Sequence, residues 1–272
     1  MNDMMLFNRT EKEKLLSEIA SGKLSHAYLI EGGEGCGKTY FARFAAAAVL
    51  CTGDKPPCGK CPSCVKALAG SHPDLFYFSP DKKASMGVET VRDIKKSLFF
   101  MPNDGDRKVY IIDDAQKMTV QAQNALLKFI EEPPASVLFF IVADKKESLL
   151  PTVVSRTRII SLAPSDNADL RRFLMSDSKK SGGEQIDEAI NMAEGSPGKA
   201  LKLLCRDFSR QRQLCLDFMP VLVSTSKSDA MAFLLSMKLN RDGDRPLPVT
   251  VWYPAAGKAG GEPERSARAA EG

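Results

Sequence analysis

The sequence predicts an α/β protein with a five-stranded parallel sheet, followed by a small helical domain. Three observations lead to this prediction. Short, fully apolar runs alternate with segments of helical periodicity, a glycine-rich phosphate-binding motif follows the first run, and the sequence changes character at Pro164. Apolar strands that alternate with helices are typical of a parallel sheet covered on both faces.

The first elements surround the glycine-rich motif. Thr10 and Glu13 form a capping-box pair that predicts the start of a helix, and Gly22 predicts its end. The apolar run at residues 27–30 predicts the first strand. Residues 39–50, TYFARFAAAAVL, place their large apolar side chains on one helical face, so a second helix should follow the motif directly.

Residues 32–39, GGEGCGKT, fit the P-loop pattern G-x-x-x-x-G-K-[ST] between a strand and a helix. Glycines let backbone N–H groups curl around phosphates, and the helix N-terminus adds a positive dipole. Lys38 would contact the β- and γ-phosphates of ATP, and the Thr39 hydroxyl would hold Mg²⁺. A glycine turn in an unrelated α/β protein is the plainer alternative. The predicted nucleotide-binding residues of this loop are Gly32, Gly33, Glu34, Gly35, Cys36, Gly37, Lys38 and Thr39.

Four of the seven cysteines lie within residues 51–64, CTGDKPPCGKCPSC. Four thiolates suit a tetrahedral structural Zn²⁺, and turns rich in glycine and proline would let them converge. The spacing departs from the two separated C-x₂-C pairs that are more usual. An iron–sulfur cluster and metal-free thiols are the alternatives. The predicted zinc ligands are Cys51, Cys58, Cys61 and Cys64, and Cys36, Cys205 and Cys215 are expected to be structural.

The next elements lead to two acidic residues. Residues 75–78 and 109–112 predict strands, and apolar residues at helical spacing over 88–98 predict the helix between them. Asp113 is the natural second magnesium group, a Walker B aspartate. Asp114 is a candidate for activating water, although aspartate is one methylene shorter than the glutamate usual here, and a misplacement of about 1 Å can cost on the order of 10²-fold in rate. A solvated acid at the strand end is the alternative for Asp114.

Two more strands complete the predicted sheet, at residues 137–142 and 158–162. A helix with apolar residues on one face over 122–130 precedes them, and Pro133-Pro134 ends it.

Beyond Pro164 the patterns are helical. Residues 168–174, 186–193 and 199–204 predict three short helices, and a further helical stretch reaches about Asn240. The last 32 residues contain five glycines and four prolines without helical periodicity, which indicates disorder. The expected domains are residues 1–163, 164–207 and 208–240, with an atypical tail at 241–272.

The composition narrows the classes of function. The 272 residues suit two or three domains, and 43% hydrophobic and 26% charged residues are ordinary for a soluble globular protein. The net charge of +4 permits contact with nucleic acid but lacks the strong basic bias of a dedicated binder. No apolar run approaches the roughly 18 residues of a membrane span, and the start lacks the layout of a secretion signal. We therefore expect a cytoplasmic protein with no membrane partner, where clustered cysteines favour metal over disulfides.

Several segments together resemble a known family. They are LSHAYLIEG (24–32), GSHPDL (70–75), IIDDAQKM (111–118), NALLKFIEEPP (124–134), SRT (155–157) and EGSPGKAL (194–201). In this order they resemble the AAA+ clamp-loader subunits of bacterial DNA polymerase III, and most closely the delta-prime type. The resemblance covers about residues 8 to 205.

The resemblance implies a division of the chain and a set of partners. It implies a nucleotide-binding domain with a zinc module inserted after the P-loop helix, then a helical lid, then the start of a helical collar. The family's collar holds a hetero-pentamer together, whereas helical sequence here ends near Asn240, so we expect a shortened C-terminus. Expected partners are the other clamp-loader subunits and, indirectly, the sliding clamp and primer-template DNA.

The resemblance also assigns roles to single residues. Arg156 corresponds to an arginine finger that acts on ATP bound by a neighbouring subunit, which suits a fixed guanidinium. An ordinary arginine after a short helix is the alternative. The sensor 1 position falls on Ala143 and the sensor 2 position on Gly198, so two polar groups of an active ATPase are missing. The implied protein is a stator that binds ATP, hydrolyses little and belongs to a nucleotidyltransferase holoenzyme.

Three other functions stay open at this point. The first is the ATP-hydrolysing gamma/tau-like motor subunit of the same machine, which Ala143 and Gly198 disfavour. The second is a stand-alone P-loop phosphotransferase, in which NALLKFIEEPP and SRT would have no role. The third is a zinc-dependent nucleic-acid-binding protein, but the cysteine segment lacks interleaved aromatic and basic residues.

Overall fold

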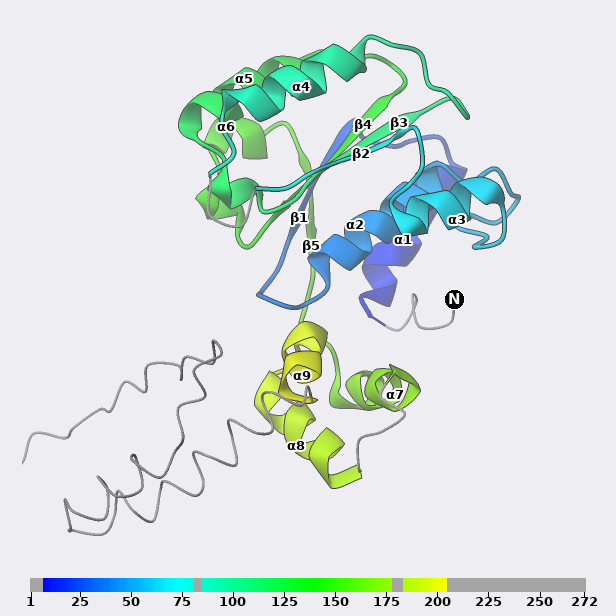
Figure 1. The fold of residues 1–272 in the computed structure, drawn as a ribbon, viewed down its shortest axis with the longest axis vertical. Helices are drawn as coiled ribbons and strands as arrows, with labels where there is room; N and C mark the ends of the chain where they lie inside the picture. Colours follow the sequence, from blue (N-terminus) through cyan, green and yellow to red (C-terminus); the bar gives the residue numbers. More distant parts are fainter. Residues whose placement is uncertain (1–6, 81–84, 178–182, 205–272) are drawn as a thin grey trace, which may run out of the picture. The chain divides into compact units, whose positions relative to one another are not determined.

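The computed structural model describes residues 7–80, 85–177 and 183–204, all within the first of two units into which the chain divides (Figure 1). Its centre is a five-stranded parallel sheet in the order β2-β3-β4-β1-β5. The predicted parallel sheet is therefore confirmed. Its strands are β1 (Ala27–Glu31), β2 (Leu75–Phe78), β3 (Lys108–Ile112), β4 (Val137–Ala143) and β5 (Arg158–Ser161).

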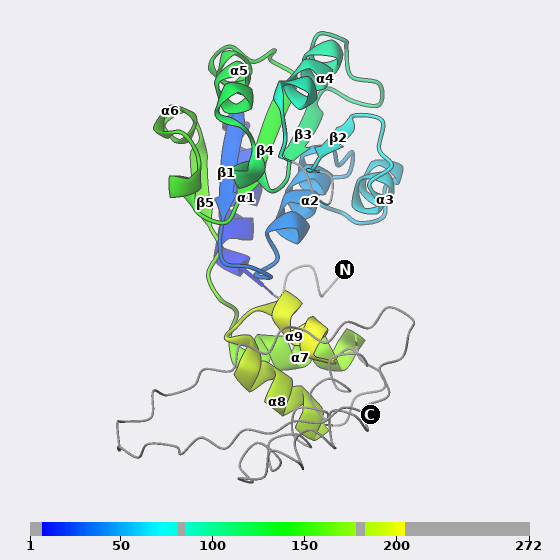
Figure 2. The same ribbon diagram turned by 60° about the vertical axis from the view of Figure 1, so that its left-hand side comes forward.

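Helices cover both faces of the sheet, as the apolar strands predicted (Figures 1 and 2). On one side lie α1 (Arg9–Ala20), α2 (Lys38–Val49) and α3 (Pro62–Ala69), and on the other lie α4 (Val88–Leu98), α5 (Val120–Glu131) and α6 (Pro151–Val154). Successive side chains of β4 alternate between the two cores, because Phe140 packs in the layer of α2 and Phe139 in the layer of α4 and α5. Two short 3₁₀ turns, Ala115–Lys117 and Lys146–Ser148, follow β3 and β4.

One predicted helix cap is wrong, and two short helices were not predicted. The capping-box prediction at Thr10 is wrong, because α1 begins at Arg9 after Asn8, which has a left-handed backbone and no side-chain cap bond. The Asn8 side chain instead accepts a hydrogen bond from the backbone N–H of Ala163, at 3.1 Å, so its cap oxygen is used by a distant segment. The sequence reading also missed α3 and α6, each of which begins with a proline in its first turn.

The motif GSHPDL (70–75) has a structural role. Asp74 is fully buried and accepts hydrogen bonds from the backbone N–H groups of Asn103 and Asp104, both at 2.7 Å. Its own N–H donates to Nδ1 of His72 at 3.0 Å. Since the unpaired N–H groups of a loop need acceptors, Asp74 fixes the connection between α4 and β3.

The three helices predicted after Pro164 are confirmed as α7 (Asn167–Asp177), α8 (Gly183–Ala193) and α9 (Pro197–Leu204). They share a small core of their own, to which Phe7 adds an edge-on contact with the ring of Phe173 at 5.2 Å between centroids. The predicted regions 208–240 and 241–272, with Cys205 and Cys215, lie outside the described residues. Within the described ranges, no helix is long and apolar enough to cross a membrane.

Candidate functional site

The P-loop connects β1 to α2 at the carboxyl edge of the sheet. Gly35 and Gly37 have left-handed backbones, with φ of 74° and 92°, which an L side chain would strain. Gly37 is also the N-cap of α2 and makes no side-chain cap bond, so the backbone N–H groups in the first turn of that 12-residue helix face the loop. The predicted motif thus has the backbone shape that phosphate binding needs.

The P-loop lysine is held by three acceptors. Lys38 Nζ donates to the carbonyl oxygens of Gly32 at 2.7 Å and Gly33 at 3.0 Å. It also forms an ion pair with Oδ1 of Asp144 at 2.9 Å. Asp144 directly follows β4, the neighbour of β1. Asp144 is not among the residues predicted from the sequence, although an acidic residue directly after an apolar strand is a usable signal.

The second predicted pair also comes together. The hydroxyl of Thr39 donates to Oδ2 of Asp113 at 2.9 Å, although the two residues belong to different strand–helix units. Hydroxyl and carboxylate oxygens are ligands that Mg²⁺ accepts, and it keeps waters and substrate phosphates at its other positions. Thr39 and Asp113 therefore fit a nucleotide-bound magnesium ion.

A tyrosine that the sequence analysis did not select supports Asp113. The Tyr77 hydroxyl, on β2, donates to the same Asp113 oxygen that Thr39 contacts, and the Arg43 guanidinium lies 5.5 Å from the centre of its ring. Burial and the hydrogen bond to Asp113 raise the pKa of Tyr77 above its ordinary value. The hydroxyl therefore keeps its proton at neutral pH and stays a donor.

Asp114 is engaged with its own turn. Its backbone is left-handed, with φ of 50°. Its carboxylate pairs with Lys117 Nζ at 2.6 Å and accepts from Gln116 Nε2 at 3.2 Å. Lys117 competes with any water for the lone pairs of this carboxylate, which favours the strand-end acid over the water-activating role.

The turn before α9 contacts the tip of the P-loop. The Ser196 hydroxyl donates to the carbonyl oxygen of Glu34 at 3.0 Å, and the N–H of Gly198 donates to that of Gly35 at 2.9 Å. A Cβ atom at Gly198 would lie 2.9 Å from Cα of Gly35, closer than real Cβ contacts. The predicted sensor 2 position is thus a backbone-to-backbone contact with no room for a side chain.

Arg156 lies just after α6 and forms an ion pair with Glu131, the last residue of α5. Arg156 Nε is 2.7 Å from Glu131 Oε1, and Nη1 donates to the carbonyl oxygen of Thr152 at 3.1 Å. Its side chain is 40% exposed. The guanidinium is therefore oriented by the end of α5 and remains accessible from outside the chain.

The four cysteines predicted as ligands converge. The Sγ atoms of Cys51, Cys58, Cys61 and Cys64 all lie within 4.8 Å of one another, and none of these residues forms a disulfide. The Cys51–Cys61 and Cys58–Cys64 sulfur pairs are each 4.0 Å apart. Four sulfurs at 2.3 Å from a tetrahedral Zn²⁺ would be roughly 3.8 Å apart, so the cluster fits this ion.

The local fold explains why the sulfurs meet. Cys51 follows the end of α2, whereas Cys61 is the N-cap of α3 and accepts from the N–H of Cys64. Hydrogen bonds from the backbone N–H groups of Lys60 and Cys61 lower the pKa of Cys58. Burial acts to raise the pKa of Cys61, but hydrogen bonds from Cys64 and Thr52 outweigh it and lower that pKa to about 5.

Cys64 is fully buried, and burial raises its pKa well above the usual range of a thiol. Ionising it therefore needs a compensating positive charge. A divalent metal ion supplies that charge, because cysteine binds metals as the thiolate. The cluster can hold a metal as a closed four-sulfur site, which leaves no position for substrate.

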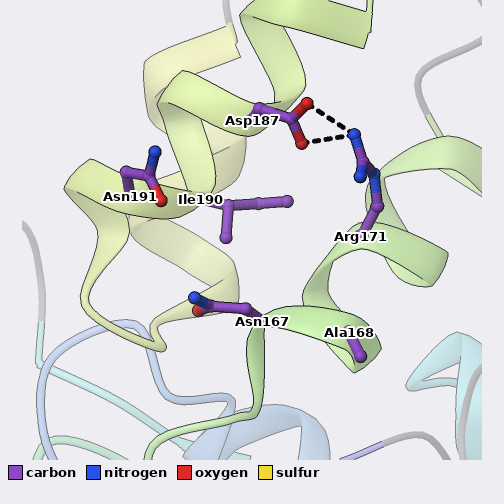
Figure 3. A pocket seen from close by; sticks show the side chains of 6 residues that line it. All are labelled: Asn167, Ala168, Arg171, Asp187, Ile190 and Asn191. Carbon is purple, nitrogen blue, oxygen red and sulfur yellow. Dashed lines mark hydrogen bonds and ion pairs between the residues drawn. The ribbon is translucent and has the colours of Figure 1, made fainter.

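A separate cavity of about 420 Å³ opens between α7 and α8 (Figure 3). The Arg171–Asp187 ion pair spans it, and none of the predicted site residues lines it. Its lining consists of Asn167, Ala168, Arg171, Asp187, Ile190 and Asn191.

The comparisons with a family model and with related proteins all point to subunits of DNA polymerase III. The family model described as DNA polymerase III, delta subunit matches residues 7–166. DNA polymerase III subunit delta' of Escherichia coli is 35% identical over 212 residues, which cover 76% of this chain and 63% of that protein. DNA polymerase III subunit gamma/tau of Mycobacterium bovis is 32% identical over 191 residues, or 68% of this chain and 33% of that protein. The chain thus spans less than two thirds of the length of these relatives.

Among solved structures, a gamma-subunit-related protein of DNA polymerase III from Thermotoga maritima aligns with a TM-score of 0.51. It is 18% identical, and the alignment covers 82% of this chain and 76% of that one. At this identity the likeness shows the fold alone.

Proposed function

Because the chain belongs to the DNA polymerase III delta subunit family, we propose that it is a delta-prime-like clamp-loader subunit that binds ATP with Mg²⁺ and acts as a stator. One observation carries the choice of a stator. The P-loop residues and the Thr39–Asp113 pair that we propose for magnesium are present, while Gly198, at the proposed sensor 2 position, is packed against Gly35 without room for an arginine. The chain therefore has the groups proposed to bind nucleotide but lacks the sensor 2 arginine that hydrolysis would use.

The proposed binding mode assigns a task to each residue. The N–H groups of the P-loop and the first turn of α2 would hold the phosphates. Lys38 would supply positive charge, and Thr39 and Asp113 would hold the magnesium ion that balances the phosphate charge. Tyr77 keeps Asp113 oriented, since both hydroxyl donors share one carboxylate oxygen.

We also propose that Arg156 of this chain acts on ATP bound by a neighbouring subunit. An accessible guanidinium oriented by Glu131 could complete another subunit's ATP site, where an arginine finger is worth roughly 10³–10⁵ in rate. Partners would be the other subunits of a hetero-pentameric loader, with the sliding clamp and primer-template DNA as indirect partners. The four cysteines would hold a structural Zn²⁺ that fixes the connection from α2 to α3.

The second candidate is a gamma/tau-like motor subunit, which the match to the mycobacterial gamma/tau protein favours. Binding and hydrolysis distinguish the two. The full chain should bind ATP–Mg²⁺ in calorimetry, lose binding in Lys38→Ala, and show no hydrolysis above that variant. Steady ATP hydrolysis by the wild type that Lys38→Ala abolishes would favour the motor subunit. Equal ATP affinity of the wild type and Lys38→Ala would show that nucleotide does not bind at the P-loop.

A further inference from the structure

Asp144 contacts the P-loop through both its side chain and its backbone. In the sheet, Glu31 at the end of β1 pairs with Ala143 at the end of β4. Asp144 is the next residue, so its carboxylate emerges at the edge where the P-loop begins. The backbone holds it there as well, because the N–H of Gly32 donates to the carbonyl oxygen of Asp144 at 3.3 Å.

Asp144 completes the hydrogen bonding of the P-loop lysine. An ammonium group has three N–H donors and no acceptor. The two loop carbonyls and Asp144 are three acceptors for Lys38, at 2.7, 3.0 and 2.9 Å. The Lys38 side chain is only 10% exposed, so it has little water to exchange. A phosphate oxygen that contacts Lys38 must therefore displace one acceptor or share a proton with it.

The carboxylate of Asp144 is fixed at both oxygens. Oδ1 pairs with Lys38, and Oδ2 accepts from Gln116 Nε2 at 3.0 Å. Gln116 is itself positioned by a second bond, to Asp114 at 3.2 Å. Rotating Asp144 away would thus break two contacts, so the negative charge should stay beside Lys38 when a nucleotide enters.

We infer that Asp144 is a specificity-determining residue that makes this P-loop prefer a nucleoside diphosphate over a nucleoside triphosphate. The inference deepens the proposed nucleotide site and rests on it. A P-loop lysine serves the β- and γ-phosphates, so a carboxylate at its ammonium group faces the terminal end of the phosphate chain. A γ-phosphate adds negative charge at that end, where the repulsion is strongest, since Coulomb energy falls with distance.

The test is the ratio of two dissociation constants, measured by calorimetry on the full chain with Mg²⁺-ATP and Mg²⁺-ADP. The wild type should bind ADP more tightly. Asp144→Asn keeps the size of the side chain and removes its charge, so it should lower the Kd for ATP about tenfold more than the Kd for ADP. Asp144→Glu keeps the charge and should keep the ADP preference. Asp144→Ser answers the same question if Asp144→Asn does not fold.

Asp106→Asn is the matched control. Asp106 is exposed and lies before β3, at the amino edge of the sheet, opposite the P-loop. The Asp106→Asn substitution removes the same charge as Asp144→Asn and should leave the ratio of the two dissociation constants unchanged. An equal ratio in wild type and Asp144→Asn, with both proteins binding and Lys38→Ala not binding, would overturn the inference and leave the nucleotide site intact. If no variant binds nucleotide, or if Lys38→Ala still binds it, both the inference about Asp144 and the proposed nucleotide site are wrong.

Discussion

Removing one ligand from the cysteine cluster should release its metal. The purified wild type should contain one zinc per chain and no visible chromophore. Cys61→Ser should lower the zinc content well below one per chain, because it removes one sulfur of the cluster, while serine can still serve as the N-cap of α3. A site of three thiolates and one weaker oxygen is no longer the closed site that a structural zinc prefers.

The expected size of the effect follows from the position of the cluster. It joins the end of α2 to the start of α3, whose residue Ala67 is fully buried against the main core. Zinc present at a thousand times its dissociation constant stabilises the folded state by about 4.1 kcal/mol. For a domain of this size, 1 kcal/mol corresponds to roughly 2–4 °C, so chelation should lower the Tm by about 8–16 °C.

The assay combines elemental analysis with thermal unfolding, each with and without a strong chelator. Cys36→Ser is the matched control, because Cys36 is a buried thiol outside the cluster. It should keep one zinc and respond to chelator like the wild type. Iron in the protein, no metal in protein purified without chelator, or full zinc in Cys61→Ser would refute the reasoning. If the chelator leaves the Tm unchanged, the metal stabilises only its own loop and not the rest of the domain.

Three further outcomes follow from the contacts. Arg156→Ala should leave folding, zinc content and nucleotide binding intact but slow ATP hydrolysis only in a reconstituted loader, and an unchanged rate there would make the residue structural. Tyr77→Phe should weaken Mg²⁺-dependent ATP binding roughly tenfold, the value of about one hydrogen bond to a charged group, without affecting binding in EDTA. Burial lowers the pKa of Lys12 from 10.5 to about 8, so the unfolded chain binds more protons between these values and stability should rise across that range by at most roughly 3 kcal/mol. Denaturation at pH 8 and pH 10 should show this rise in wild type and a smaller one in Lys12→Met.

The contact between α9 and the P-loop would couple any movement of the loop to the helices after β5. Besides Ser196 and Gly198, Lys202 on α9 pairs with Glu34 of the P-loop at 3.0 Å. Because that pair is largely exposed, it contributes little by itself, and the close backbone packing at Gly198 is the more demanding contact. Any widening of the P-loop would therefore have to move the start of α9.

The sequence alone determined the strands, most helices, the P-loop and the four-cysteine set. These features depend on neighbours along the chain: apolar runs mark buried strands, and short spacings in the sequence bring the sulfur atoms of Cys58, Cys61 and Cys64 within 4.8 Å of one another. Helix boundaries were harder to predict: the residue before α1, Asn8, does not cap the helix with its side chain, which accepts a hydrogen bond from Ala163, 155 residues away.

Only the tertiary structure decided which distant side chains complete the site. The strand order places β4 beside β1, which brings Asp144 to Lys38 across 106 residues, and β2 beside β3, which brings Tyr77 to Asp113. The packing of α9 likewise places Gly198 on Gly35. Strand order and helix docking arise from the sum of many contacts between segments far apart in the chain, so no local pattern specifies them.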